Sequence, residues 1–354
     1  MINDIQQINM KVLVTGHLGY IGSVMVPILL SADFDVTGLD AGFYQESPLN
    51  QGATAKNFKQ LQGDIRNIAT CQLTNFDAVI HLAGISYDRL GQFDQQLTTE
   101  INSQATIDLA RKAKQAGVSR FLFASSCSVY GTSLDTDLNE DAVLNPLSPY
   151  AKSKAISEEQ LNAIASSNFS PVSLRNASAY GVSPSFRADL VLNNFVGWAK
   201  TSQKICLSSD GLSWRPLIHV ADISQAFLMI LKAPTELIHA QIFNVGVKGE
   251  NYPIHQLAQQ VKEVTGGCQV EKEDKATSDP RNYRVDFSKF YQTFPGYQPQ
   301  WNVERGIKQL SEFFGKNGML TEDMTKSPFI RLKQLANLQQ SGRLDHRLRW
   351  INPN

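Results

Sequence analysis

The sequence is poor in cysteine, and the few cysteines it has are widely separated. Its 354 residues include four cysteines, and no two of them form a Cys-x-x-Cys pair. Such spacing predicts neither a zinc site nor a disulfide framework, and it suits a reducing compartment. We therefore expect no metal site and a cytoplasmic protein. The four positions are Cys71, Cys127, Cys206 and Cys268.

Long apolar runs are also missing. The most apolar stretch, Val12 to Leu30, is interrupted by glycines, a histidine and a proline, so it is a poor candidate for a membrane span. Residues 1–10 are polar and lack the basic and then apolar pattern of a signal peptide. We expect a soluble protein without a membrane partner.

The chain has no excess of either charge. Its 33 Lys and Arg residues balance 33 Asp and Glu residues, which gives a formal net charge of zero. A neutral chain exerts no general attraction on nucleic acid, although a local basic patch is compatible with that total. The hydrophobic fraction of 42% supports a sizeable core and argues against a disordered chain.

What the sequence does contain, in its first half, is an alternation of short apolar runs and helical patterns. Residues 98–115 carry apolar side chains at steps of four, which marks one face of a helix. Strands that alternate with helices predict βαβ units and a parallel sheet. The predicted strands of this half are Val12–Val14, Val36–Leu39, Ala78–Leu82 and Phe121–Ala124.

The second half is less regular but continues the mixture. We predict strands at Pro171–Leu174 and Gln241–Val245, and helices at Asp189–Ala199, Ala221–Leu231 and Ile254–Val264. The polar residues 277–284 predict a loop. The spacing of residues 329–350, together with several arginines, predicts a solvent-exposed helix.

A glycine-rich turn follows the first strand and opens a helix. Gly16 permits a tight turn, Gly19 allows the backbone to approach a pyrophosphate, and Gly22 lets the helix pack closely on the sheet. The helix N-terminus then offers N–H groups to phosphates. The candidate cofactor-binding residues here are Gly16, His17, Leu18, Gly19, Tyr20, Ile21 and Gly22.

Asp40 supports the same interpretation. It ends the second predicted strand, close to the spacing expected for the acid that binds the adenosine ribose hydroxyls. Ala41 and Gly42 follow, and neither supplies the arginine that a 2′-phosphate requires. The turn and this aspartate together predict NAD as the cofactor.

A tyrosine and a lysine share a helix face further along the chain. Tyr150 and Lys154 are four residues apart, whereas Lys152 lies on a different face. An ammonium beside a phenol favours the phenolate, which makes Tyr150 a candidate general base near neutral pH. Ser125 and Ser126 end the fourth predicted strand, where ligands bind in open α/β sheets.

Taken together, these motifs resemble the extended short-chain dehydrogenase/reductase family, the NAD-dependent epimerases and dehydratases of nucleotide sugars. The resemblance runs from Lys11 to about Trp301 and includes Val129-Tyr130-Gly131. It implies a Rossmann-type doubly wound parallel sheet with a smaller C-terminal substrate-binding lobe. We expect an NAD-binding domain at residues 1–176, with later elements near 216–247 returning to it, and a nucleotide-sugar lobe mainly at 177–354.

The resemblance also assigns roles to single residues. It implies a catalytic set of Ser126, Tyr150, Lys154 and Asn102. In this set Asn102 shapes the active site, and Lys154 also binds the nicotinamide ribose. Further cofactor contacts are implied for Asp64, Ile65, Leu82, Ala83 and Gly84. Candidate substrate-binding residues are Ser125, Ser126, Cys127, Ser178, Arg187, Asn193, Asn194, Arg215 and Arg281. For His219 the resemblance favours a structural role.

The sequence departs from the family pattern at informative places. The 4,6-dehydratases carry Thr-Asp-Glu where this chain has Ser126, Cys127 and Ser128, so the carboxylates for water loss are missing. A thiol can move protons, but we favour a packing role for Cys127. The arginine of the family's late loop is replaced by Ala276; Arg281 or Arg284 would supply that phosphate contact, unless both are surface residues.

These observations predict an NAD-dependent nucleotide-sugar epimerase that oxidises the sugar transiently at C4, with Tyr150 as base. The alternative on the same site is a nucleotide 4-keto-sugar reductase or sugar dehydrogenase, and a catalytically silent NAD-binding protein is a third. The resemblance further implies a homodimer formed through the helices at residues 98–115 and 150–167.

Overall fold

The computed structural model describes residues 10–45, 58–86, 94–327 and 329–351, without the side chains of 134–136 and 275. The prediction that residues 1–10 do not form a signal peptide falls mostly outside the described part, because residues 1–9 are not described. Among the described residues, no helix has the length and apolarity needed to cross a membrane.

Seven parallel strands form the central sheet, in the order β11-β7-β5-β4-β1-β2-β3. This arrangement confirms the predicted Rossmann-type sheet. The order reverses between β1 and β4, and ligands bind at the carboxyl ends of the strands at such a point. The strands are β1 (Lys11–Thr15), β2 (Asp35–Asp40), β3 (Lys59–Gln62), β4 (Ala78–His81), β5 (Arg120–Ser126), β7 (Ser170–Asn176) and β11 (Ile242–Val245).

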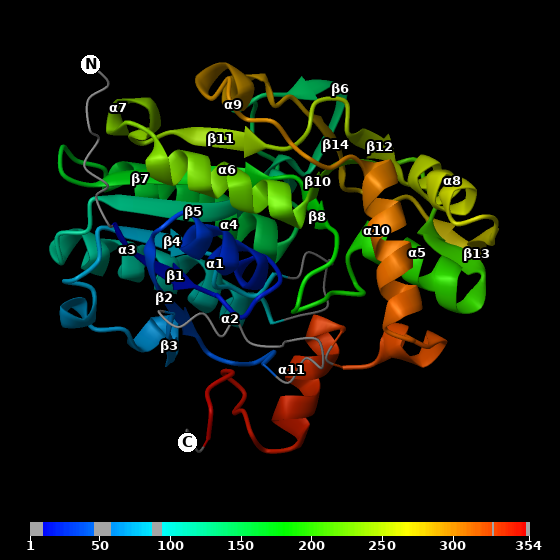
Figure 1. Cartoon of the computed structure of the whole chain (residues 1–354), viewed down its shortest axis with the longest axis horizontal. Helices are drawn as coiled ribbons and strands as arrows, with labels where there is room; N and C mark the ends of the chain where they lie inside the picture. The colour runs from blue at the N-terminus through cyan, green and yellow to red at the C-terminus, as the bar shows by residue number, and fades with distance from the viewer. Residues whose placement is uncertain (1–9, 46–57, 87–93, 328, 352–354) are drawn as a thin grey trace.

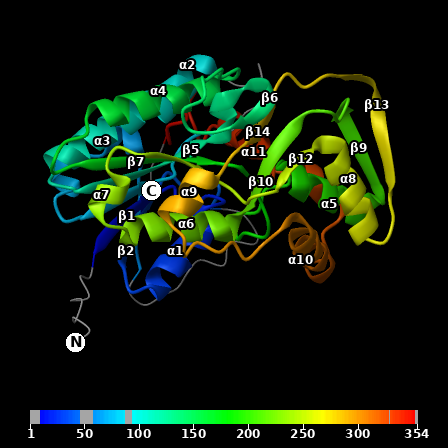
Figure 2. The same ribbon diagram turned by 90° about the horizontal axis from the view of Figure 1, so that it is seen from above.

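Helices cover both faces of this sheet (Figure 2). One face carries α1 (Gly22–Ser31) and α6 (Val220–Lys232). The other carries α4 (Pro149–Ala163) and a continuous helical run. That run consists of α2 (Gln95–Thr99), a π-helical turn (Glu100–Gln104) and α3 (Ala105–Gln115).

A smaller lobe packs beside the carboxyl ends of the strands (Figure 1). Its apolar core includes Phe195, Leu257 and Leu310, one from each of its three main helices. These helices are α5 (Val191–Ser202), α8 (Ile254–Val264) and α10 (Val303–Lys316). Its strands are β8 (Ser178–Tyr180), β10 (Trp214–His219) and β12 (Asn251–Pro253) in one sheet, and β9 (Lys204–Ser209) and β13 (Gln269–Thr277) in another.

The chain crosses between the two parts more than once. After the lobe begins, α6 packs against α1, and β11 joins the central sheet beside β7. The remaining elements are β6 (Thr132–Leu138), which pairs with β14 (Asn282–Val285), the helices α7 (Thr235–Ile238) and α9 (Ser288–Thr293), and 3-10 turns at Ile65–Asn67, Thr70–Gln72, Cys127–Tyr130 and Thr321–Thr325.

The prediction of a loop at residues 277–284 was wrong at both of its ends. Thr277 closes β13, and Asn282 opens β14, which lies parallel to β6. Tyr283 and Val285 are buried while Arg284 is more exposed, so the strand alternates between its two faces. Polar neighbours hide this short alternation in the sequence.

The prediction of one solvent-exposed helix at residues 329–350 was also wrong. Helix α11 (Arg331–Gln340) stops at Gly342, whose φ of +69° suits the left-handed residue that ends many helices. Leu344 then bridges to Trp350. The segment is not solvated on all sides, because Leu335, Leu338 and Leu348 pack in a buried apolar cluster. The cluster also contains Ile85 and Leu97, which belong to the part of the chain built on the central sheet, here called the cofactor domain.

Candidate active site

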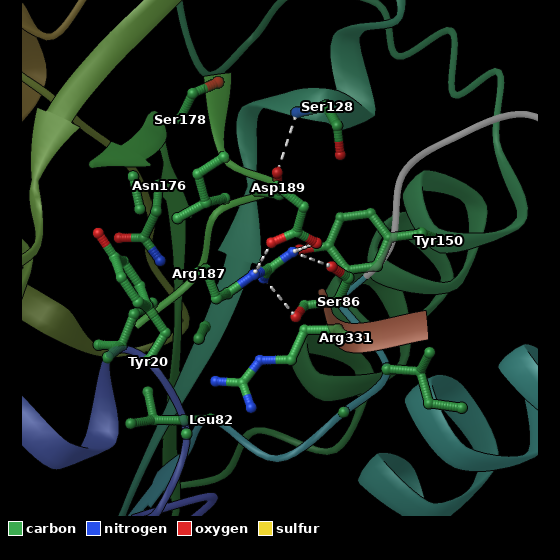
Figure 3. A pocket seen from close by; sticks show the side chains of 18 of the residues that line it. Tyr20, Leu82, Ser86, Ser128, Tyr150, Asn176, Ser178, Arg187, Asp189 and Arg331 are labelled. Atoms are coloured by element: carbon green, nitrogen blue, oxygen red, sulfur yellow. Dashed lines mark hydrogen bonds and ion pairs between the residues drawn. The ribbon is translucent and has the colours of Figure 1, made fainter. Parts of the chain in front are cut away.

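A cavity of about 480 Å³ lies where the sheet, the smaller lobe and α11 meet. Figure 3 shows it from close by. The site residues predicted from the sequence that line it are Gly16, Gly19, Tyr20, Ile21, Gly22, Asp40, Asp64, Ile65, Leu82, Ala83, Gly84, Ser125, Ser126, Tyr150, Lys154, Ser178, Arg187, Asn194, Arg215 and Arg281.

The glycine-rich turn forms one wall of this cavity, between β1 and α1. Gly16 has a φ of +80°, and a Cβ there would lie 2.7 Å from the backbone nitrogen of Ala83. A Cβ on Gly22 would lie 2.3 Å from the carbonyl oxygen of Gly16. Side chains are therefore excluded at Gly16 and Gly22, so the turn packs closely on the loop after β4 and on the start of α1, as in turns whose backbone binds a phosphate group.

Two residues of this turn face elsewhere. His17 is buried under Gly38, and its Nε2 lies 3.2 Å from the side-chain oxygen of Gln60. The backbone N–H of Leu18 donates to the Asp40 carboxylate over 3.1 Å. The structure therefore gives His17 and Leu18 a role in shaping the turn, because neither lines the cavity.

Two carboxylates mark the adenosine end. Asp40 ends β2, and its carboxylate also accepts the N–H of Gly42 over 2.8 Å, so the backbone fixes its direction. Asp64 lies at the start of the next turn and forms an ion pair with Arg66, 2.5 Å from oxygen to nitrogen. These residues fit the cofactor predicted from the sequence, since NAD combines a diphosphate with ribose hydroxyls.

Asn102 supports the cavity without lining it. Its side-chain oxygen accepts the N–H of Ile85 over 2.7 Å, and its nitrogen donates to the carbonyl of the same residue over 2.9 Å. It lies in the π-helical turn, a rare element that is frequent at functional sites. Both polar atoms of the side chain hold the loop after β4, so the structure gives Asn102 a positioning role next to the cavity.

Tyr150 and Lys154 both face the cavity from α4. The Nζ atom of Lys154 lies 5.7 Å from the centre of the Tyr150 ring and donates to the carbonyl of Ala124 over 2.7 Å. Burial lowers the pKa of Lys154 to about 8, so most of the ammonium stays charged at neutral pH. A buried positive charge next to the phenol favours the phenolate.

The segment after β5 supplies serines but no carboxylate. Ser126 accepts the N–H of Ser128 over 3.2 Å, and both residues line the cavity. The hydroxyl of Ser128 is buried and has no hydrogen-bond partner among the described residues. Ser125 donates to the buried carboxylate of Glu158.

Cys127 is corrected from a candidate substrate contact to a core residue. Its side chain is 1% exposed, packs in the main apolar cluster and lies outside the cavity lining. The thiol points to the carbonyl of Arg175, 3.1 Å away. Burial raises the pKa of the thiol above its usual value, which disfavours a thiolate near neutral pH.

An ion pair that the sequence did not reveal lies beside Tyr150. The guanidinium of Arg187 binds the carboxylate of Asp189 over 2.9 Å and donates to the hydroxyl of Ser86 over 2.9 Å. Figure 3 shows this pair next to the Tyr150 ring. Burial alone would raise the pKa of Asp189, but the guanidinium outweighs burial and lowers it, so the carboxylate stays ionised.

Several residues predicted to bind the nucleotide line the same cavity. Arg215 and Arg281 share the carboxylate of Asp279, each at 2.8 Å. Arg284 does not line the cavity and pairs with Asp137, which leaves Arg281 as the candidate of the two. Ser178 lines the cavity from β8, and Asn194 lines it from α5.

Asn193 is corrected to a structural residue. Its side-chain oxygen accepts the N–H of Gly181 over 2.9 Å, and its nitrogen donates to the carbonyl of Arg187 over 2.9 Å. It is fully buried and joins the loop before α5 to the rest of the lobe. His219 is likewise buried and stacks on Trp301 at 4.1 Å, which agrees with the structural role favoured for it.

Comparison with known proteins decides the family. The model of the NAD-dependent epimerase/dehydratase family matches residues 12–246. The chain belongs to this family. A dTDP-D-glucose 4,6-dehydratase of Mus musculus is 30% identical over 323 residues, which cover 87% of this chain and 89% of that protein.

An epimerase and a solved structure with bound NAD are also similar to this chain. A UDP-glucose 4-epimerase of Mycolicibacterium smegmatis is 29% identical over 86% of this chain and 98% of its own length. The structure of MoeE5 in complex with UDP-glucuronic acid and NAD has a TM-score of 0.75, 25% identity, and coverage of 87% of this chain and 99% of that one. The NAD cofactor and the class of enzyme expected from the sequence are confirmed.

Proposed function

We propose that this family member is a nucleotide-sugar 4-epimerase that uses Tyr150 as its base. The observation that carries the proposal is the joint placement of Tyr150, Lys154 and Ser126 around one cavity that also holds the glycine turn. These are the groups needed to remove a hydroxyl proton while a hydride leaves the same carbon. The similarity to a UDP-glucose 4-epimerase supports the proposal.

In this scheme Ser126 and Tyr150 bind the sugar 4-hydroxyl. Tyr150 accepts the hydroxyl proton as a phenolate, and Lys154 stabilises the phenolate by its buried charge. Bound NAD would supply a reversible hydride acceptor in this site. For epimerisation, the protein must hold the nucleotide end while the keto sugar turns, and Arg215 and Arg281 line the cavity as candidates to hold it.

Dehydration is disfavoured by the carboxylates at hand, although several relatives are dehydratases. Water loss needs a side chain that can donate a proton near neutral pH. Among the described residues, Asp189 is the carboxylate beside Tyr150, and its ion pair with Arg187 keeps it ionised. Cys127 is buried away from the cavity and cannot replace the missing acid.

The proposal is tested by giving the purified protein UDP- and dTDP-hexoses and resolving the products by chromatography. We expect a pair of sugars that differ in configuration at C4, formed without added NAD, because an epimerase restores its cofactor in every cycle. A product that has lost water would contradict the proposal. So would stoichiometric NADH with no epimer, the result expected of the alternative sugar dehydrogenase.

A further inference from the structure

Four arginines are buried in the described part of the chain, and one of them differs from the rest. Three are neutralised by a carboxylate at 2.8–2.9 Å: Arg175 by Glu158, Arg187 by Asp189 and Arg215 by Asp279. Arg331 forms no ion pair with a described residue. A buried charge without a counter-ion is costly, so such a residue calls for an anion that binds next to it.

Hydrogen bonds fix the guanidinium of Arg331 but use only some of its N–H donors. It lies in α11 and is 5% exposed. Its Nη2 donates to the carbonyl and the hydroxyl of Ser185 over 3.0 and 2.7 Å, and its guanidinium lies 3.7 Å from the centre of the Tyr44 ring. Its Nε and Nη1 groups have no acceptor among the described residues. Burial lowers its pKa to about 10, which leaves it charged at neutral pH.

The free side of this guanidinium faces the cofactor part of the cavity. Figure 3 shows it directed toward Tyr20, which belongs to the glycine turn, and Leu82, and away from Tyr150. Asp40, at the adenosine end, is among the charges that act on it. It therefore stands across the cavity from the turn whose backbone is open to phosphate.

We propose that Arg331 binds the diphosphate of NAD from the side opposite the glycine turn. The planar fork of a guanidinium suits phosphate oxygens, and the bound anion provides the missing counter-charge. Helix α11 lies beyond residues 12–246, the part that the family model matches. The C-terminal segment thus adds a cofactor contact to the common core of the family.

The segment that carries Arg331 is fixed to the cofactor domain at its other end. The indole nitrogen of Trp350 donates to the carbonyl of Ala41 over 2.6 Å, directly after Asp40. Arg66, the partner of Asp64, donates to the carbonyl of Arg347 over 2.8 Å. These contacts place residues 331–351 over the adenosine end of the site, and Figure 1 shows α11 and the tail beside that edge of the sheet.

The test compares Arg331→Gln and Arg331→Lys with the control Arg343→Gln, which alters an arginine of the same segment outside the cavity lining. Calorimetry on protein freed of NAD measures the Kd values of ADP-ribose and adenosine. We expect Arg331→Gln to weaken ADP-ribose binding about 10- to 100-fold and to leave adenosine unchanged. Arg331→Lys should retain part of the affinity, and the control all of it.

Stability of the ligand-free protein gives an independent readout. If the buried charge of Arg331 has no counter-ion until an anion binds, the Tm of ligand-free Arg331→Gln equals or exceeds that of the wild type. The increase in Tm on addition of ADP-ribose is then smaller for the variant than for the wild type. A lower Tm without ligand, or equal losses for adenosine and ADP-ribose, would show a packing role and overturn the proposal. Weaker binding of UDP or dTDP with ADP-ribose unaffected would assign the arginine to the substrate and overturn it as well.

Discussion

Two lysines of α4, Lys152 and Lys154, lie close to Tyr150 in the sequence, and only one of them is placed to assist it. Lys154 is buried with its Nζ 5.7 Å from the tyrosine ring centre, whereas Lys152 is exposed on the same helix. We expect Lys154→Met to lower kcat about 100-fold or more, because the phenolate loses its neighbouring charge. Lys152→Met is the matched control and should keep wild-type kcat in steady-state assays. Equal effects of the two changes would contradict the assignment.

Tyr150→Phe separates chemistry from binding. Removing the hydroxyl deletes the proton acceptor but leaves the ring and the rest of the cavity in place. We expect turnover to be lost while the Kd for NAD, measured by calorimetry, stays close to that of the wild type. Activity that survives in Tyr150→Phe would require another base.

Cys127 offers the opposite test. Its thiol is buried and points away from the cavity toward a backbone carbonyl. We expect Cys127→Ala to keep kcat within about threefold while lowering the Tm modestly, because only core packing is lost. A loss of kcat as large as that of Tyr150→Phe, in a variant that still folds, would show that the thiol takes part in catalysis.

The residues that sequence reasoning located share a local signal. Gly16, Asp40 and Tyr150 stand at fixed spacings from the ends of strands or within one helix turn. Arg331 and Asp189 carry no such signal, because the fold brings them to the cavity from remote parts of the chain. Nothing in the sequence indicated that Asn193 points away from the cavity, since its orientation is set by tertiary packing, whereas a packing role was already favoured for Cys127.

At the scale of elements, the buried strands were predictable and the peripheral ones were not. The inner strands β1, β4 and β5 are covered on both faces, so each is a continuous apolar run that stands out in the sequence. β14 is a four-residue strand that alternates among polar neighbours. Helix α11 has the spacing of an exposed helix, yet it packs on the cofactor domain through an apolar face that the arginines of the tail conceal.

The strand β4 carries a buried histidine that links stability to pH. His81 bonds to the hydroxyls of Thr15 and Thr106 at 2.6 and 2.8 Å, and burial, aided by the charge of Lys154, lowers its pKa to about 3. Between pH 6.5 and 3 the unfolded chain therefore binds a proton that the folded one does not. The stability contributed by neutral His81 is lost as the pH falls through this window.

We therefore expect the free energy of unfolding, measured by denaturant titration, to fall by up to about 1.4 kcal/mol per pH unit below 6.5 from this residue. His81→Gln should reduce the slope of the unfolding free energy against pH in this range, whatever the stability of the variant at pH 7. His346→Gln, which alters an exposed histidine, should leave the slope unchanged. An unchanged slope in His81→Gln would show that other groups cause the loss of stability below pH 6.5.

At the scale of the whole molecule, the balance of charge agrees with the way the site is built. The chain has no net charge, yet the cavity is lined by several arginines, and four of them form ion pairs with aspartates. The groups available to bind anionic ligands are thus the backbone of the glycine turn and a few guanidinium groups at defined positions. This distribution could not be predicted from composition, because a net charge of zero carries no information about where charges cluster.

The homodimer expected from the sequence stays a prediction, and α4 offers a direct test. Ile156 lies on the outer side of α4, 44% exposed. If α4 and the helical run before it form the interface, Ile156→Glu places a charge in an apolar contact and shifts the protein to monomers in sedimentation velocity. Leu320→Glu, in the smaller lobe, should not. A monomeric wild type, or a dimer unaffected by Ile156→Glu, would contradict this interface.

The return of the hydride from the cofactor to the sugar can be followed directly with an isotope label. A nucleotide hexose that carries deuterium at C4 is turned over with catalytic amounts of protein and without added NAD, and the products are read by mass spectrometry and NMR. The account predicts a C4 epimer that retains the deuterium at C4, because the hydride removed from the sugar is returned to it. A product without the label at C4, or label found in free NADH with no epimer formed, would contradict it.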